Sequence, residues 1–195
     1  YGRILFNSTL PVDYPFVNDQ APKKRLSKIV DDIATRYSTA QVAATLDALK
    51  DLGFTRAPWS GVSFAFSDVI QPPELDEYIE KYEDEADKVN ENYEIGMLTE
   101  EERRQELIDL WTKCTSEVSE AVEEHFDSKN NLAIIVQSGA RGNMMQINQI
   151  AGMRGLVANP KGEIIPRPVK SNYRDGLSVL EYFISQHGAR KGLAD

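Results

Sequence analysis

Few residues of this chain have the types and spacing that a chemical site requires. His125 and His187 lie far apart, and Cys114 is the single cysteine, so no zinc-ligand spacing is present. No G-x-S-x-G context for a nucleophile occurs. The acidic run at 82–94 lacks the alternating Asp/Asn ligands and the glycine of a calcium loop. The sequence therefore predicts no metal site and no complete catalytic set.

Two arginine segments bracketed by glycines are the remaining candidates for chemistry. "GARGNM" contains Arg141, and "GARKGLA" contains Arg190 and Lys191. Glycines beside a helix start can cradle phosphate oxygens, although neither segment is the G-x-x-x-x-G-K-[ST] loop. One interpretation is phosphate binding, chiefly through Arg141. The other is that these arginines only keep the surface soluble.

The C-terminal third contains the elements that must position these arginines. The run at 131–137 predicts a short buried strand or helix, and an amphipathic helix is expected around 144–151. Residues 156–169 predict a hairpin that turns at 159–162, with its prolines confining the return strand to an edge. A helix over 173–186 is expected to end near Gly188, with its inward face formed by Leu177, Leu180, Phe183 and Ile184.

The clearest periodicity lies in 74–126. Apolar positions recur with spacings of 4, 3, 4, 3 and 4 in two successive helices that a short turn joins. Thr99 and Glu102 form a capping box at the second start. The pattern predicts an antiparallel coiled-coil hairpin; two helices buried in a globular core are the alternative. The seam residues are Leu75, Ile79, Tyr82, Ala86, Val89 and Tyr93, then Leu107, Trp111, Cys114, Val118, Ala121 and His125.

The N-terminal part predicts two helices and one or two strands. The first helix spans 22–37, and the second begins after Ser38, has a capping box with Gln41 and ends at Gly53. The alternating run at 59–70 predicts short strands. With the rest of the chain, this indicates an α+β fold, mainly helical with small β elements and a protruding antiparallel coiled-coil hairpin. The expected divisions are 1–71, 72–127 and 128–195.

Composition and charge limit the function classes. The N-terminus does not read as a signal peptide, no run is apolar and long enough to span a membrane, and one cysteine fits a reducing cytosol, so a cytoplasmic protein is expected. The net charge of −9 is uneven: 74–127 carries −15, whereas 131–195 carries +4. The two segments are therefore expected to face different partners.

The quoted residues also carry a resemblance. "SGARGN" and "QINQIAGMRGLVANPKGEIIPRPVKSNYRDGLSVLEYFISQHGARKGLAD" resemble the middle of the β′ subunit of bacterial DNA-directed RNA polymerase, a nucleotidyltransferase. The likeness continues upstream through "YGRILFN", "YPFVN", "LKDLGF" and "SGVS" and covers essentially the whole chain. "NPKGEIIPRPVKS" is most similar to actinobacterial members.

The resemblance assigns parts of a larger enzyme. The region up to about residue 70 would lie at the pore, and the hairpin would form the rim helices of the secondary channel, where nucleotides enter and transcript-cleavage factors dock. Arg141 would reach the triphosphate of the incoming nucleotide, as a planar guanidinium can. The docking tip would comprise Gly96, Met97, Leu98, Thr99, Glu100 and Glu101; the F-loop would include Gln146, Gln149, Met153 and Arg154; the bridge-helix hinge would comprise Gly188, Arg190, Lys191 and Gly192.

Departures from the family limit what this chain can do by itself. Asn148 stands where the family often has arginine, and the aspartate motif that binds magnesium is absent. Phosphoryl transfer depends on metal ions, so the chain alone is expected to be inactive and to bind no cofactor, with Mg and Zn held elsewhere in the whole subunit. The implied partners are the β, α, ω and σ subunits, cleavage factors, DNA, RNA and nucleoside triphosphates, with no membrane. The alternatives are a free-standing acidic adaptor and a self-contained phosphate-handling enzyme.

Overall fold

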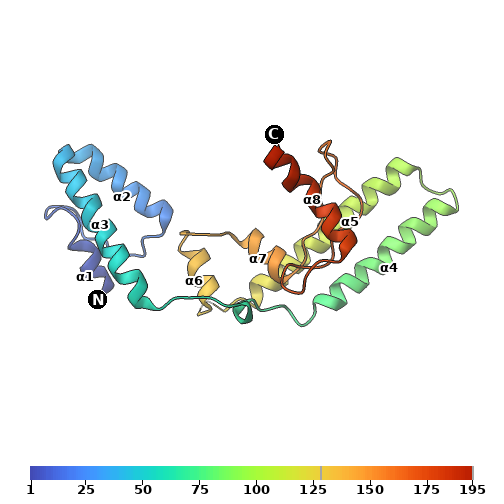
Figure 1. Cartoon of the computed structure of the whole chain (residues 1–195), viewed down its shortest axis with the longest axis horizontal. Helices are drawn as coiled ribbons and strands as arrows, with labels where there is room; N and C mark the ends of the chain where they lie inside the picture. The colour runs from blue at the N-terminus through green and yellow to red at the C-terminus, as the bar shows by residue number, and fades with distance from the viewer. Residues whose placement is uncertain (128, 195) are drawn as a thin grey trace. The chain divides into compact units, whose positions relative to one another are not determined.

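The computed structural model describes residues 1–127 and 129–194, without the side chain of Lys191. The chain is mainly helical and divides into two compact units (Figure 1). Unit 1 comprises 1–64 and 131–142, and unit 2 comprises 65–130 and 143–195. The helices of the described residues are α1 Gly2–Asn7, α2 Lys23–Arg36, α3 Thr39–Ser60, the 3-10 helix η1 Phe66–Asp68, α4 Leu75–Glu94, α5 Glu100–Glu124, α6 Asn131–Gln137, α7 Met144–Ala151 and α8 Val179–Ala194.

Unit 1 is built from α1, α2, α3 and α6. Its core consists of Leu10 and Val17 from the segment before α2, together with Ile29 and Ile33, which lie four residues apart on one face of α2. The predicted helix at 22–37 is confirmed as α2, and so is the capping box of Ser38 and Gln41 at the start of α3. Local sequence signals are therefore sufficient to place these two helix starts.

Two predictions for this region are wrong. Helix α3 continues through Gly53 and ends at Ser60; the next residue, Gly61, has a φ of 65°, the left-handed conformation that favours glycine after a helix. An interior glycine lowers helix stability by only about 1 kcal/mol, which the rest of a long helix offsets. The strands expected at 59–70 do not form: the segment contains the end of α3 and η1, and Phe64 and Phe66 are exposed.

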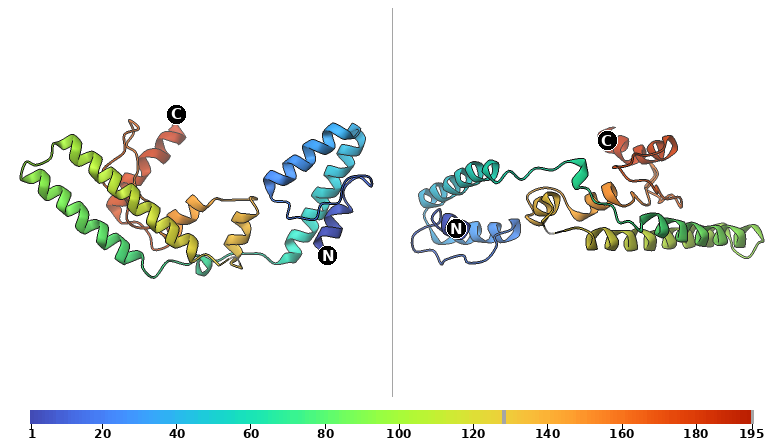
Figure 2. Two further views of the ribbon diagram at one scale, coloured as in Figure 1. Left: turned by 180° about the vertical axis from the view of Figure 1, so that it is seen from behind. Right: turned by 90° about the horizontal axis from the view of Figure 1, so that it is seen from below.

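Unit 2 is dominated by α4 and α5, which lie side by side and are joined by a short turn (Figures 1 and 2). Most of the predicted seam residues are buried. The buried seam residues are Leu75, Tyr82, Ala86, Leu107, Trp111, Cys114, Val118 and Ala121. His125, by contrast, is the residue after α5, and its Nδ1 lies 2.9 Å from the carbonyl oxygen of Ala121. The two paired helices match the predicted hairpin, while its coiled-coil geometry stays a prediction.

The small β elements are not confirmed. Residues 155–169 fold back as predicted and make two isolated antiparallel bridges, Gly155 with Val169 and Ala158 with Ile164. No strand forms within 1–127 or 129–194. Pro166 and Pro168 have no N–H to extend the ladder, which explains why the return segment stays irregular. The run at 131–137, where strand and helix were both open, is the helix α6.

Helix α8 differs from its prediction in length and in its exposed face. It continues past Gly188 to Ala194 instead of ending near Gly188. Leu180 and Phe183, which were expected to point inward, are 51% and 64% exposed. Ser185 is the buried residue among the described side chains of this helix. The apolar pattern of α8 was therefore a poor guide to the face that packs within unit 2.

Candidate functional site

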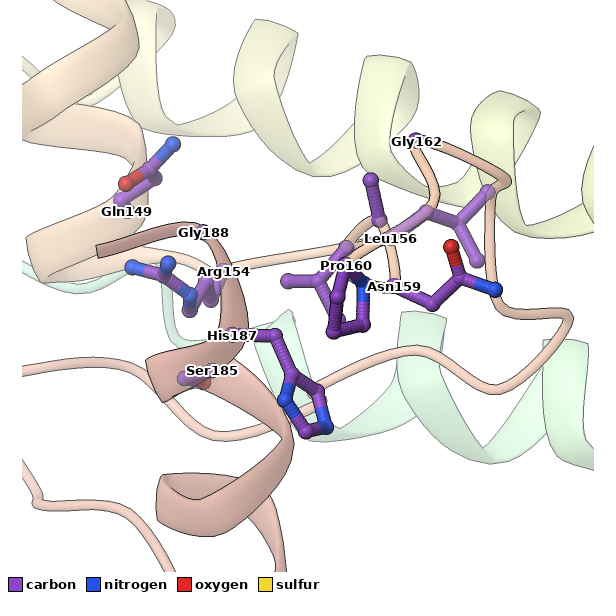
Figure 3. A pocket seen from close by; sticks show the side chains of 11 residues that line it. Gln149, Arg154, Leu156, Asn159, Pro160, Gly162, Ser185, His187 and Gly188 are labelled. Atoms are coloured by element: carbon purple, nitrogen blue, oxygen red, sulfur yellow. The ribbon is translucent and has the colours of Figure 1, made fainter. Parts of the chain in front are cut away.

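A cavity of about 390 Å³ lies within unit 2 between α7, the segment 154–162 and α8 (Figure 3). It brings together Gln149, Arg154 and Gly188, which the resemblance assigns to two different functional parts. Figure 3 also shows Ser185 and His187 from α8 and Asn159 from the turn around the same cavity. The lining residues are Gln149, Arg154, Leu156, Val157, Ala158, Asn159, Pro160, Gly162, Ser185, His187 and Gly188.

Arg154 is the cation of this cavity, and it is partly buried. Its Nε atom is buried without a hydrogen-bond partner among the described residues. Its guanidinium carbon lies 5.3 Å from the centre of the Tyr173 ring, a cation–π distance. Burial lowers the pKa of the guanidinium below its usual value, because water is removed from a charged group.

Helix α7 positions Gln149 and the segment that leads to Arg154. The Asn143 side chain accepts a hydrogen bond from the N–H of Gln146, and Oε1 of Gln146 accepts one from the N–H of Asn143, so Gln146 has a capping role. After α7, the chain approaches α5 so closely that a Cβ on Gly152 would lie 2.8 Å from Cγ1 of Val118. This contact fixes the start of the segment 152–155 against the hairpin.

Met153 is a packing residue at this point. It is 2% exposed, and its sulfur lies 3.8 Å from Sγ of Cys114 on α5. Burial raises the pKa of the Cys114 thiol to about 11, in agreement with its interpretation as an unreactive core residue. Of the four predicted F-loop residues, Gln149 and Arg154 line the cavity, whereas Gln146 and Met153 support it.

The first turn of α8 is fixed by Glu181. Its carboxylate accepts hydrogen bonds from the N–H groups of Lys170, Ser171 and Ser178 and from the hydroxyl of Ser171. Burial by itself raises the pKa of Glu181, but the hydrogen bonds from Ser178 and Ser171 outweigh it and lower the pKa to about 2. The S-x-x-E pattern at 178–181 is a capping box that could have been found in the sequence.

The predicted hinge residues are helical. Gly188 and Gly192 lie inside α8, and a Cβ on either would have no atom within 4 Å. Arg190 is exposed, and the side chain of Lys191 lies outside the described residues. Among Gly188, Arg190 and Gly192, Gly188 is the residue that lines the cavity.

Arg141 belongs to unit 1 and is exposed in the loop between α6 and α7. Gly139 and Gly142 on either side have φ values of 72° and 78°, which only glycine adopts readily. The N–H of Lys23 at the start of α2 donates to the carbonyl oxygen of Ser138. The start of this loop is therefore attached to α2 at Lys23, and Arg141 makes no ion pair to any residue in the described ranges.

The tip of the α4–α5 hairpin is acidic and ordered by local contacts. The Thr99 hydroxyl accepts from the N–H of Glu102, and the Glu102 carboxylate accepts from the N–H of Thr99. Glu100 is paired with Arg103 at 2.7 Å, and this guanidinium lies 4.6 Å from the Tyr93 ring centre. Gly96 adopts a φ of 79°, while Ile95 and Met97 are 69% and 71% exposed. Apolar side chains on a rigid acidic tip are suited to contact a basic protein surface.

Two further observations concern metal ligands and membrane-spanning helices. Across 1–127 and 129–194, no three His, Cys, Asp or Glu side chains gather as ligands for a metal ion. None of the helices in that part of the chain is long and apolar enough to cross a bilayer.

The comparisons with known proteins agree with one another. Residues 98–181 match the family described as RNA polymerase Rpb1, domain 4. The chain is 97% identical over 195 residues to DNA-directed RNA polymerase subunit beta' of Bifidobacterium adolescentis, 86% identical to that of Bifidobacterium longum and 60% identical, over 194 residues, to that of Acidothermus cellulolyticus.

Each of these matches covers 100% of the chain but only 14–15% of the relative. The chain therefore spans about one seventh of the length of the curated relatives that it matches. The resemblance noted in the sequence is confirmed, including its actinobacterial character. By sequence, this chain belongs to the β′ family of bacterial DNA-directed RNA polymerase subunits, as a segment of that length.

Proposed function

We propose that this chain acts within the β′ subunit of a DNA-directed RNA polymerase, where it forms walls of the secondary channel and part of the nucleotide entry path. The observation that supports this most is the 97% identity to a β′ subunit over every residue of the chain. Such identity does not favour a free-standing acidic adaptor. The other polymerase subunits, DNA and RNA are the partners of the whole assembly in this proposal.

The chain contributes positioning and charge in this proposal, and not the metal chemistry. Mg and Zn are proposed to be held elsewhere in the whole subunit, because the sequence lacks the aspartate motif that binds magnesium in the family it resembles. The purified chain should therefore incorporate no nucleotide on a primed template. Template-dependent incorporation by the chain alone would contradict this assignment.

Arg141 is proposed to contact the triphosphate of the incoming nucleotide. Its exposure, its glycine-bordered loop and its lack of an ion pair in the described ranges support this role. In assembled polymerase, Arg141→Ala should raise KM for nucleotides by about tenfold, since a charge-assisted hydrogen bond to phosphate is lost. Arg56→Ala, at another exposed arginine of unit 1, is the matched control and should leave KM unchanged.

The hairpin tip at 96–101 is proposed to dock transcript-cleavage factors. Glu101 is the best test position, because it is exposed and lacks the ion pair that Glu100 makes with Arg103. In assembled polymerase, Glu101→Lys should weaken binding of a cleavage factor, measured by titration. Glu120→Lys reverses an exposed charge elsewhere on α5 and should bind normally. Equal affinity for both variants would contradict docking at the tip.

The segment 146–157 and the hinge at 188–192 are proposed to act together. The support is that Gln149, Arg154 and Gly188 line one cavity. A change in the conformation of α8 near Gly188 would therefore alter the surroundings of the segment that follows α7. An unstrained Gly188→Ala change should make this part of α8 stiffer. The prediction is slower nucleotide addition by assembled polymerase with unchanged nucleotide KM, measured by rapid quenching.

A further inference from the structure

The return segment, defined here as 164–171, joins the hairpin to α8 within unit 2. Near its start, the guanidinium of Arg104 on α5 donates a hydrogen bond to the carbonyl oxygen of Ile164 at 3.1 Å. Near its end, the N–H groups of Lys170 and Ser171 donate to the Glu181 carboxylate at 3.1 and 3.2 Å. The return segment therefore contacts α5 at one end and the first turn of α8 at the other.

The side chain of Lys170 reaches both helices of the hairpin. Its ammonium group forms an ion pair with the Glu83 carboxylate on α4. The same group lies 5.6 Å from the centre of the Trp111 ring on α5, a cation–π distance. The side chains of Lys170 and Glu83 are 39% and 41% exposed, so water screens this pair less than it would a fully exposed pair. One residue thus binds the hairpin through its side chain and Glu181 through its backbone N–H.

Polar contacts of this kind matter for α8 because much of its apolar surface is not packed within unit 2. Val179, Tyr182 and Phe183 near its start are 88%, 58% and 64% exposed. The Glu181 carboxylate, in contrast, accepts hydrogen bonds from the return segment and from the N–H of Ser178. A displacement of Lys170 relative to α4 would therefore move a donor that fixes the first turn of α8.

We propose that Lys170 is a positioning residue for nucleotide addition, which holds the start of α8 at the hairpin through its ion pair with Glu83. The inference rests on the proposed role of 188–192 of α8 as a hinge, and it adds the contact that fixes the other end of that helix. Lys170 touches no reacting group in this proposal. Its loss should therefore lower the rate constant of nucleotide addition and leave nucleotide KM unchanged.

The test uses assembled polymerase that carries Lys170→Met. This variant keeps a long apolar side chain and the backbone N–H that donates to Glu181, and it removes the charge. The rate constant of nucleotide addition, measured by rapid quenching, should fall about threefold, as expected for the loss of one partly exposed ion pair. Lys170→Arg keeps a positive charge and should restore most of the rate. An unchanged rate in Lys170→Met, or a raised KM at an unchanged rate, would overturn the proposal.

Lys81→Met is the matched control. Lys81 forms an ion pair with Glu117 at 3.6 Å, and its ammonium group lies 4.9 Å from the centre of the Tyr82 ring. It therefore makes the same two kinds of contact as Lys170, but both lie inside the hairpin. Its loss should leave nucleotide addition unchanged. Equal losses in the two lysine variants would indicate a general effect on the hairpin and refute a specific role of Lys170.

Glu83→Gln tests the ion pair from the other side, and it decides the question if Lys170→Met does not assemble. It should slow nucleotide addition by a similar factor. In the double variant of Glu83→Gln and Lys170→Met no further loss is expected, because two partners of one contact are not additive. Fully additive losses would show that the two side chains act independently, which the proposal does not allow.

Gly188→Ala separates this inference from the proposed hinge. Slow addition in Gly188→Ala with normal addition in Lys170→Met would refute the role of Lys170 and leave the hinge intact. Slow addition in Lys170→Met with normal addition in Gly188→Ala would support the contact at the start of α8 and contradict the hinge.

Discussion

The α4–α5 hairpin and α8 differ both in apolar pattern and in burial: the hairpin repeats apolar residues at spacings of 4 and 3, whereas α8 has no such repeat. In the hairpin, Tyr82 and Cys114 are 0% exposed, because the turn at 95–99 brings the two faces together within one segment of chain. On α8, Val179 and Leu193 are 88% and 90% exposed. The hairpin is held by apolar burial, whereas the first turn of α8 is held by hydrogen bonds to the Glu181 carboxylate. A repeat predicts burial reliably only when its partner is nearby in sequence.

The largest expected effect is the difference in free energy of unfolding between truncating a buried residue of the hairpin and truncating an exposed residue of α8. Trp111 in the hairpin is 3% exposed, and Phe183 on α8 is 64% exposed. Trp111→Ala should lower the free energy of unfolding by about 3–5 kcal/mol, while Phe183→Ala should change it by less than about 0.5 kcal/mol. Urea unfolding of the chain measures both. Comparable losses would mean that the exposed face of α8 is packed in solution.

Glu181 should make the attachment of α8 sensitive to acid. Its pKa is lowered from 4.5 to about 2, so its stabilisation is fully present above about pH 5 and is lost as the pH falls toward 2. Glu181→Gln should destabilise the chain by roughly 2 kcal/mol at pH 7 and by little at pH 2. Hydrogen exchange of α8 amides against pH measures this. Exchange in the hairpin core is the internal control and should not depend on Glu181.

Two glycine-to-alanine changes should have opposite signs. A Cβ on Gly152 would lie 2.8 Å from Cγ1 of Val118, whereas a Cβ on Gly188 would meet no atom within 4 Å. Gly152→Ala should destabilise by about 1–3 kcal/mol through overpacking, and Gly188→Ala should stabilise by about 0.5–1 kcal/mol through lower chain entropy. Thermal unfolding gives the two signs. A destabilising Gly188→Ala would show that α8 needs glycine flexibility even in this chain.

The smallest effect concerns the hairpin tip. Thr99→Ala removes the side chain that accepts from the N–H of Glu102, which should lower stability by about 1 kcal/mol. Ser116→Ala, at an exposed position inside α5, is the control and should be close to neutral. Faster amide exchange confined to 99–103 would show that the cap orders the tip.

Much of the local architecture was predictable. The starts of α2, α3 and α5 and most of the buried seam follow from short-range patterns, because capping and i, i+3/i+4 spacing act within a few residues. The end of α3 was missed because Gly53 resembles a stop signal, and only the conformation of Gly61 decided the end. The strands at 59–70 were wrongly predicted, because alternation of apolar residues does not supply the partner that a strand needs to complete its hydrogen bonds.

The candidate site was predictable in its parts but not in its assembly. Gln149, Arg154 and Gly188 were selected from the family resemblance, yet nothing in their spacing brings them to one cavity. Asn159, Ser185 and His187 were not predicted, because a serine or histidine on a helix shows no sequence signal until its neighbours are known. Arg141 and the hairpin tip remain functional predictions of the resemblance.

The sequence by itself determined the family, the paired helices of the hairpin and the uneven charge, since identity, periodicity and composition are properties of the chain alone. The tertiary structure decided that Pro166 and Pro168 leave only isolated bridges, that α8 exposes its apolar face, and that Arg154 and Ser185 share one cavity. The physical reason is that burial and desolvation depend on tertiary contacts between segments far apart in the sequence. A local sequence pattern does not specify those contacts.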